Sequence, residues 1–300
     1  MKFKPNTRVY IAGCGGMLGE AVFARIAATG AILLASDIDV NEPWLVYGDV
    51  RDCGSMGKAI RSFEPDVIIN LAALTDLEHC EREPEDSWLT NALGAENLGV
   101  IAAKLDVPYV YISTAGIFGG EKDCYNDFDT PNPLAMYAKS KYYGERYVCT
   151  NVPKHFVLRA GWMMGGGPKK DKKFINKIYK QIQAGAKILN VVNDKLGTPT
   201  YTVDFANGMV KIIESELYGL YNQVCSGTSS RYEVAVEFIR LLGHESTIKI
   251  NIVESDFFAK DYFAPRPASE QLVNQKLNQL GLNYMRDWKI CLAEYANSFR

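Results

Sequence analysis

The sequence predicts an α/β protein whose core is a doubly wound, mostly parallel β-sheet. Short apolar runs alternate with patterns of helical periodicity through the first half of the 300 residues, and this alternation is typical of βαβ units with helices on both faces of a sheet. A glycine-rich turn at residues 13–19 follows the first apolar run directly. Polar residues stand at the ends of several later runs, where such sheets bind their ligands.

The composition indicates a globular chain of one large or two unequal domains. Hydrophobic residues make up 47% and charged residues 23% of the sequence, and the net charge is -2. No apolar run reaches the roughly 18 residues of a membrane span, and there is no signal-peptide core, so we expect a cytoplasmic protein without a membrane partner. The near-neutral charge argues against nucleic acid, and the basic run at residues 169–173 is typical of a solvated loop. Seven cysteines and three scattered histidines show no zinc-type spacing.

The first predicted strand, turn and helix form a dinucleotide-binding pattern of the Rossmann type. Residues 8–12 read as a buried strand, and apolar side chains repeat at helical spacing from residue 18 to residue 30. The glycines allow a tight bend and let backbone N–H groups approach a pyrophosphate at the helix N-terminus. A purely structural turn is the alternative. The residues expected at the pyrophosphate are Gly13, Gly16, Met17, Leu18 and Gly19.

Acidic residues follow the second and third predicted strands, at residues 31–36 and 45–48. Asp37 lies roughly 20 residues beyond the glycine turn, where a carboxylate accepts hydrogen bonds from an adenosine ribose. Neither Arg nor Lys follows it directly, so the pattern favours NADH over NADPH, although Asp39 and the loop at Asn41 are near enough to reshape the pocket. Asp49 and Val50 stand where a strand end can hold adenine, with an exposed turn as the alternative.

Two further strand ends complete the predicted ligand-binding edge. Residues 65–70 form a buried strand that runs into a stretch of mostly small residues at 71–75, which lets a ligand approach the backbone. A helical stretch from residue 84 through Asn91 to residue 101 precedes the strand at 108–112. That strand ends in Ser113 and Thr114.

Tyr137 and Lys141 are the strongest candidates for the chemistry. Their four-residue spacing puts both side chains on one face of a helix, pointing into the same cleft. A fixed ammonium beside a phenol, whose free pKa is about 10, favours the phenolate and lowers that pKa. Tyr137 would then act as a general acid toward a carbonyl oxygen. With 17 tyrosines in the chain, a chance Tyr-x-x-x-Lys pair is the alternative.

The order of these motifs resembles that of the extended short-chain dehydrogenase/reductases, and most of all the dTDP-4-dehydrorhamnose reductase family. The matching stretches span most of the chain: the glycine turn, Asp37, Asp49, NLAA at 70–73, Asn91, ST at 113–114, YxxxK at 137–141, RAGW at 159–162, GTPT at 197–200 and PRPAS at 265–269. The resemblance implies an NAD(P)-binding Rossmann domain at residues 1–160. It implies that residues 161–300 form mainly a small substrate-binding α/β lid, with some segments crossing back.

The resemblance also implies an NADH- or NADPH-dependent oxidoreductase that reduces the C4 ketone of a nucleoside-diphosphate 4-keto-6-deoxy sugar. Thr114 would bind the ketone oxygen, Tyr137 would donate the proton, and Lys141 would hold the nicotinamide ribose. Further implied cofactor contacts are Leu71, Ala72, Ala73 and Asn91, and further substrate contacts are Thr75, Ala115, Trp162 and Arg266. Arg266 suits a diphosphate, because a guanidinium pairs with two phosphate oxygens at once.

Two departures from the family pattern bear on these expectations. Where these reductases usually carry Asp-Tyr after the threonine, this chain has Ala115 and Gly116, which leaves the identity of the sugar open. The same change removes the Asp-Glu pair of sugar-nucleotide 4,6-dehydratases, so dehydration is disfavoured. Ala21 stands where some members place an acidic metal ligand, so we expect no metal ion.

Other functions and roles stay open. A sugar-nucleotide epimerase that retains its NAD, or a non-catalytic nucleotide-binding regulatory subunit, would keep the same fold, and we expect a monomer or a homodimer. In the second half, helices are expected at residues 172–184 and 202–214 and from a Ser229 or Ser230 cap to residue 242, with strands at 186–192, 220–225 and 247–253. A core position is the alternative for Trp162, and a surface turn for Arg266.

Overall fold

The largest sheet of the protein has seven strands, all parallel. The computed structural model describes residues 1–300. In spatial order the strands are β11 (Gly219–Asn222), β6 (His155–Ala160), β5 (Tyr109–Thr114), β4 (Val67–Asn70), β1 (Arg8–Ala12), β2 (Ile32–Asp37) and β3 (Leu45–Tyr47). The order changes direction between β1 and β4, and ligands bind at such a switch point. This topology confirms the predicted doubly wound fold.

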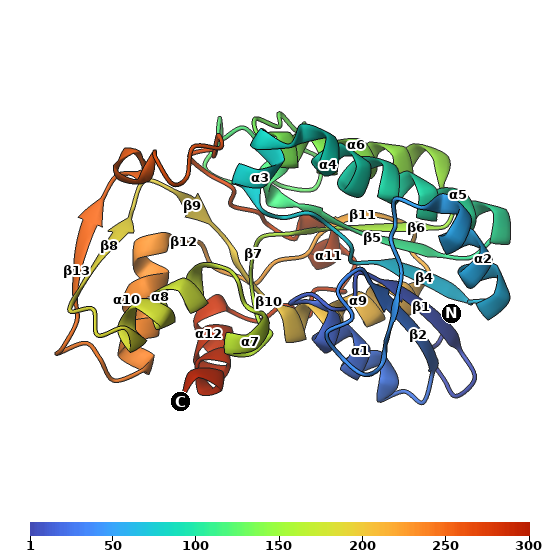
Figure 1. The fold of residues 1–300 in the computed structure, drawn as a ribbon, viewed down its shortest axis with the longest axis horizontal. Coiled ribbons are helices and arrows are strands. Elements are labelled where there is room, and N and C mark those ends of the chain that lie inside the picture. The colour runs from blue at the N-terminus through green and yellow to red at the C-terminus, as the bar shows by residue number, and fades with distance from the viewer.

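Helices cover both faces of the sheet (Figure 1). One face carries α2 (Cys53–Phe63), α5 (Gly94–Leu105) and α6 (Met136–Asn151), and the other carries α1 (Gly19–Ala27) and α9 (Thr202–Ser215). Alternate residues of β1 enter different cores: Val9 and Ile11 pack in the cluster of α1, and Tyr10 and Ala12 in the cluster of α5. A strand buried on both faces requires this period of two.

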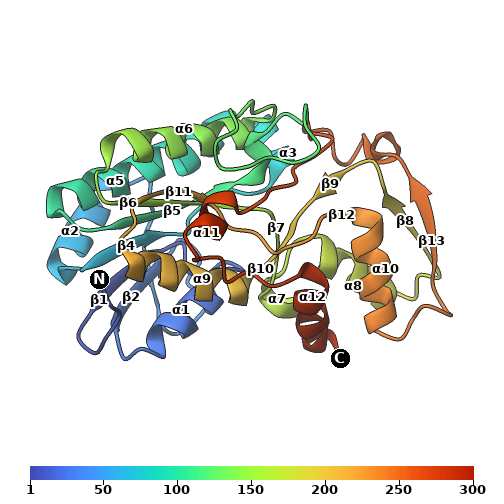
Figure 2. The ribbon, with the colours of Figure 1, turned by 180° about the vertical axis from the view of Figure 1, so that it is seen from behind.

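The chain after β6 builds a second part beside the sheet (Figure 2). Its longer helices are α8 (Phe174–Gln183), α10 (Arg231–Leu241) and α12 (Trp288–Ala296). Its strands pair two by two: β7 (Trp162–Met164) with β10 (Pro199–Tyr201), β8 (Ile188–Val192) with β13 (Lys249–Val253), and β9 (Leu196–Gly197) with β12 (Ser229–Ser230). The segments α9 and β11 return to the central sheet, so the chain passes between the two parts more than once.

Most elements expected from the sequence are present, with small shifts at their ends. The helix expected from residue 172 begins at Phe174, because the Asp171 carboxylate accepts the Lys173 N–H at 2.6 Å just before the first turn. Ser230 caps α10 in a reciprocal capping box with Glu233. None of the helices combines the length and the hydropathy needed to cross a bilayer.

Candidate active site

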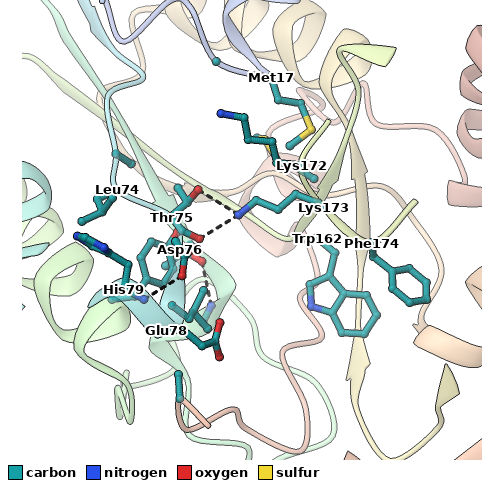
Figure 3. A pocket seen from close by; sticks show the side chains of 18 of the residues that line it. Met17, Leu74, Thr75, Asp76, Glu78, His79, Trp162, Lys172, Lys173 and Phe174 are labelled. Carbon is teal, nitrogen blue, oxygen red and sulfur yellow. Dashed lines mark hydrogen bonds between the residues drawn. The ribbon is translucent and has the colours of Figure 1, made fainter. Parts of the chain in front are cut away.

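A large cavity lies at the carboxyl ends of β1, β4 and β5. Its volume is about 1600 Å³, and its opposite wall comes from the second part of the chain. Figure 3 shows the region where these two walls face one another. The residues expected at the site that line this cavity are Gly13, Gly16, Met17, Leu18, Gly19, Asp37, Asp49, Val50, Leu71, Ala72, Ala73, Thr75, Thr114, Tyr137, Lys141, Trp162 and Arg266.

The glycines of the first turn differ in what surrounds them. Gly13 has a φ of 72°, and a Cβ added to it would collide with the backbone of Ala72. A Cβ on Gly19 would collide with the backbone of Cys14. At Gly16 the nearest atom to an added Cβ is the Gly13 carbonyl oxygen, 3.9 Å away. Gly13 and Gly19 therefore serve the packing of the turn, whereas Gly16 leaves its backbone open toward the cavity.

Asp37 is tied to the glycine turn by backbone hydrogen bonds. Its Oδ2 accepts the Gly15 N–H at 2.8 Å, and its Oδ1 accepts the Asp39 N–H at 3.0 Å. The Asn41 side chain donates to the Gly15 carbonyl at 3.3 Å. These contacts hold the carboxylate at the end of β2, beside the turn that precedes α1.

Asp49 is engaged by a neighbouring guanidinium. Arg51 Nη2 lies 2.7 Å from Asp49 Oδ2, and Arg51 Nε lies 2.9 Å from Oδ1. The hydrogen bonds from Arg51 hold the pKa of the Asp49 carboxyl below its usual range. A ligand that bonds to Asp49 must therefore share it with Arg51.

Asn91 does not line the cavity, contrary to the contact that the family resemblance implies. It lies in a π-helical turn, Trp88–Leu93, where its side chain brackets the Leu74 backbone: Oδ1 accepts the Leu74 N–H at 2.9 Å, and Nδ2 donates to the Leu74 carbonyl at 3.0 Å. Nδ2 also lies 3.1 Å from Ser140 Oγ on α6. Asn91 thus joins the loop after β4 to the helix that carries Tyr137 and Lys141.

Tyr137 and Lys141 lie in α6 and both line the cavity, as their spacing predicts. Burial raises the pKa of Tyr137 to about 12, and the nearby Thr114 hydroxyl acts in the opposite direction. The predicted lowering of this pKa by Lys141 is wrong, because burial penalises the phenolate more than its neighbours stabilise it. Tyr137 is therefore a protonated phenol at neutral pH.

Lys141 is almost fully enclosed. Burial lowers the pKa of its ammonium to about 7, and the Glu145 charge opposes that change. Its Nζ lies 4.2 Å from the centre of the Tyr111 ring, within cation–π distance. Glu145 is itself held by Arg159, whose Nη2 lies 2.6 Å from Oε1, and by Ser113, whose hydroxyl donates to Oε2 at 2.6 Å. The buried ion pair of Glu145 and Arg159 is therefore part of the electrostatic surroundings of Lys141.

Of the expected substrate contacts, Ala115 is turned away from the cavity and Arg266 is already paired. Ala115 packs in a buried apolar cluster with Ile117 and Phe118 and does not line the cavity, because the turn after β5 directs it inward. Arg266 Nη2 pairs with Glu78 Oε1 at 2.7 Å, and its Nη1 donates to the Ala264 carbonyl at 2.9 Å. Arg266 therefore faces the cavity as part of an ion pair.

The basic run at residues 169–173 is not simply a solvated loop, and that expectation is wrong for two of its lysines. Lys170 is 9% exposed and pairs with Glu42 at 3.0 Å. Lys173 Nζ crosses the cavity and donates to the Thr75 carbonyl at 2.9 Å and to Thr75 Oγ1 at 3.0 Å (Figure 3). Lys173 thereby joins the second part of the chain to the loop after β4.

Two charged residues of the cavity wall were missed by sequence reasoning. Arg231, at the first turn of α10, lies with its Cζ 3.5 Å from the centre of the Trp162 ring. Glu270 accepts a hydrogen bond from Trp162 Nε1 through its Oε2, at 3.1 Å. Neither residue belongs to a recognisable motif, and no spacing in the sequence could have singled them out.

Comparison with known proteins identifies the family. The model of the RmlD substrate binding domain matches residues 7–300. The chain belongs to this family. A relative is the dTDP-4-dehydrorhamnose reductase of Mycolicibacterium smegmatis, which is 30% identical over 295 residues, with 96% of this chain and 84% of that protein covered. Methionine adenosyltransferase 2 subunit beta of Xenopus tropicalis is 27% identical, with 97% of this chain and 87% of that protein covered.

Solved structures of RmlD relatives have the same architecture. The dTDP-4-dehydrorhamnose reductase of Yersinia enterocolitica has a TM-score of 0.87 at 34% identity, with 98% of this chain and 100% of that one covered. The Bacillus anthracis dTDP-4-dehydrorhamnose reductase, solved in complex with NADP, has a TM-score of 0.86 at 26% identity, with coverage of 97% and 98%. The RmlD family thus includes reductases that share this whole chain, second part included.

Proposed function

We propose that this protein is an NAD(P)H-dependent oxidoreductase that reduces the C4 ketone of a nucleoside-diphosphate 4-keto-6-deoxy sugar in deoxysugar biosynthesis. The observation that carries the proposal is that Thr114 at the end of β5 and Tyr137 and Lys141 of α6 line one cavity with the open glycine turn. Membership of the RmlD family and the reductases among the relatives support the same reaction.

The residues around the glycine turn fit a dinucleotide. The open backbone at Gly16, where an added Cβ would meet no atom closer than 3.9 Å, leaves room for a pyrophosphate at the N-terminus of α1. Asp37 suits the ribose hydroxyls of the adenosine half, and Asp49 with Val50 suits the adenine. When bound, the reduced nicotinamide supplies the hydride that the ketone carbon receives.

Thr114 and Tyr137 would act on the ketone oxygen. Both side chains can donate a hydrogen bond to an oxygen that gains negative charge in the transition state, and Tyr137 then gives up its proton. The raised pKa of Tyr137 suits an acid, because the phenol keeps its proton until the alkoxide forms. Lys141, held near Tyr111, would place its ammonium at the nicotinamide ribose and add a positive charge beneath the reacting oxygen.

The two parts of the chain would divide these tasks. Residues 1–160 would bind the cofactor and carry the three catalytic residues, and residues 161–300 would mainly form the lid over the sugar nucleotide. Arg266 would bind the diphosphate by exchanging its Glu78 partner for phosphate oxygens. The protein would work in the cytoplasm as a monomer or homodimer, without nucleic acid and without a metal ion.

A panel of 4-keto-6-deoxy sugar nucleotides with each reduced cofactor tests the proposal. We expect NADH or NADPH oxidation, followed at 340 nm, with at least one member of the panel, and one product reduced at C4. No oxidation with any member would refute the proposal. Purified protein that carries tightly bound NAD and interconverts sugar nucleotides without added reductant would instead indicate an epimerase.

A non-catalytic nucleotide-binding regulatory subunit is the second candidate, and the likeness to methionine adenosyltransferase 2 subunit beta supports it. The presence of Thr114, Tyr137 and Lys141 in one cavity counts against it, because binding alone does not need a proton donor. Cofactor binding without turnover of any sugar nucleotide would favour this role.

A further inference from the structure

Three side chains in the cavity wall form a cluster on the lid side: Trp162, Arg231 and Glu270. The indole N–H of Trp162 donates to Glu270 Oε2 at 3.1 Å, and the Arg231 guanidinium lies 3.5 Å from the centre of the indole ring. All three line the same cavity as Thr114 and Tyr137. None of the motifs that identify the dinucleotide site involves Arg231 or Glu270.

The Trp162 ring is clamped and cannot stack on a ligand. A Cβ added to Gly197 would fall onto the face of the ring, against its Cε2, Cζ2 and Cδ2 atoms, so the Gly197 backbone lies directly on the indole. The Arg231 guanidinium also lies over the ring. Two groups that each stand directly over ring atoms cannot share one face, so they cover opposite faces. What Trp162 presents is its N–H edge, and that edge is directed at Glu270.

The backbone of residues 196–198 contacts each of the three segments that carry these side chains. Trp162 N donates to the Thr198 carbonyl at 2.9 Å, and Glu270 N donates to the Leu196 carbonyl at 2.9 Å. Arg231 follows β12, which pairs with β9 through Ser230 and Leu196. The segments that carry the carboxylate, the indole and the guanidinium are therefore all attached to residues 196–198.

The Glu270 carboxylate has a free oxygen in the cavity that Thr114 and Tyr137 also line. Oε2 is taken by Trp162, and no hydrogen bond from the protein reaches Oε1. Burial raises the pKa of Glu270, and the positive charge of Arg231 is the largest effect that opposes this change. Glu270 and Tyr137 line the same cavity, and the charge of Glu270 contributes to the raised pKa of Tyr137.

We propose that Glu270 accepts a hydrogen bond from a ring hydroxyl of the substrate sugar, and that Trp162 and Arg231 are positioning residues for its carboxylate. This inference rests on the proposed reduction of a sugar nucleotide. A neutral hydroxyl fits better than an ammonium group, because Arg231, Arg266 and Lys195 already surround the carboxylate with positive charge. Glu270 thereby supplies sugar recognition from the second part of the chain.

Binding measurements separate this role from turnover. Calorimetry would compare dTDP, the reduced dTDP-6-deoxysugar, and analogues that each lack one ring hydroxyl. We expect Glu270→Gln to weaken binding of the dTDP-6-deoxysugar by about 10- to 100-fold, the size of one hydrogen bond to a charged group, and to leave dTDP unchanged. The analogue that lacks the hydroxyl recognised by Glu270 should bind equally weakly to the wild type and to Glu270→Gln. The reason is that removing either the hydroxyl or its carboxylate acceptor already removes their hydrogen bond.

Two further variants test the positioning roles and the loss of charge. Trp162→Phe keeps a ring between Gly197 and Arg231 but removes the N–H, so it should weaken sugar binding less than Glu270→Gln does. The double variant should bind the sugar as weakly as Glu270→Gln alone. Asp256→Asn neutralises an exposed carboxylate that lines the same cavity and should leave sugar binding unchanged. Thermal melts of each variant control for folding.

Two results would overturn the assignment. The first is an equal loss of dTDP and dTDP-sugar affinity in Glu270→Gln. The second is a Glu270→Gln variant that loses affinity by the same factor for every deoxy analogue as for the full sugar. A failure of the proposed reduction looks different: the wild type would then oxidise no NADH or NADPH with any 4-keto sugar, while the binding comparison would still decide the role of Glu270.

Discussion

Replacing Lys141 with methionine should stabilise the folded protein while abolishing its activity. Only 3% of Lys141 is exposed, and burial lowers the pKa of its ammonium from 10.5 to about 7. A pKa change of one corresponds to about 1.4 kcal/mol, so burial of the charge costs at most about 5 kcal/mol. The contact with the Tyr111 ring offsets about 1–2 kcal/mol of this. We therefore expect the free energy of unfolding to rise by about 2–4 kcal/mol at pH 6.

The gain should depend on pH with a defined sign. Between pH 7 and pH 10.5 the unfolded chain keeps a proton on Lys141 that the folded chain has released, so the free energy of unfolding of the wild type rises with pH in this window. Below about pH 7 both states are protonated, and the full penalty is present. The advantage of Lys141→Met should therefore be greatest at pH 6 and should shrink steadily toward pH 10.

Urea denaturation at pH 6, 8 and 9.5 measures this directly. Lys139→Met is the matched control, since Lys139 lies on the same helix but is exposed, and its effect should stay within about 0.5 kcal/mol at every pH. A Lys141→Met variant that is less stable than the wild type at pH 6 would refute the reasoning. So would a gain that does not change with pH.

Three further substitutions test the proposed roles, and a fourth, Gly13→Ala, serves as a contrast to Gly16→Val. Tyr137→Phe should lower kcat by roughly 10²–10⁴ and leave cofactor affinity nearly unchanged, measured by NADH oxidation and by fluorescence titration. Gly16→Val should weaken cofactor binding by about 10- to 100-fold through lost pyrophosphate hydrogen bonds without moving the unfolding midpoint, whereas Gly13→Ala should destabilise the fold because its Cβ meets the Ala72 backbone. Asp37→Ala should shift the cofactor preference toward NADPH by relieving repulsion of the 2′-phosphate, as measured by the ratio of kcat/KM values.

Each of these expectations can fail in a distinct way. Near wild-type turnover in Tyr137→Phe would remove Tyr137 as the acid. Unchanged NADH affinity in a folded Gly16→Val variant would exclude the glycine turn from the site. A wild type that already prefers NADPH strongly would contradict the ribose role of Asp37.

The parts of the site that could be predicted are those encoded by local spacing. The glycine turn can be recognised from one strand, one turn and one helix, and the four-residue spacing of Tyr137 and Lys141 from one helix. Both features face the same cavity because the carboxyl ends of parallel strands share one edge of the sheet. The strand–helix alternation is equally local, which is why the fold class was predictable.

The contacts that escaped prediction join distant segments. The Trp162–Glu270 hydrogen bond spans 108 residues, and the Lys173–Thr75 contact spans 98. Asn91 lies in a π-helical turn and its side chain brackets the Leu74 backbone, and no periodicity marks such a turn. Each depends on how the second part of the chain or the helices pack, which is a property of the assembled molecule.

The order in which Tyr137 and Lys141 titrate reverses what their spacing alone suggests. With the pKa of Tyr137 raised to about 12 and that of Lys141 lowered to about 7, the phenol stays protonated across neutral pH, and the group that changes charge is the lysine. Because kcat/KM reports groups of the free enzyme, it should fall as pH rises through about 7, and Lys141 should be the cause.

The Lys141→Arg variant shows whether residue 141 or Tyr137 causes the loss of kcat/KM at alkaline pH. A guanidinium stays charged, so Lys141→Arg should move the alkaline limb of kcat/KM upward by about two pH units or more, even if its absolute rate is lower. The residual activity of Tyr137→Phe should keep the inflection near 7, since Lys141 is intact there. Were the inflection to vanish in Tyr137→Phe and persist unmoved in Lys141→Arg, the phenol would be the titrating group, and burial would not be what controls this site.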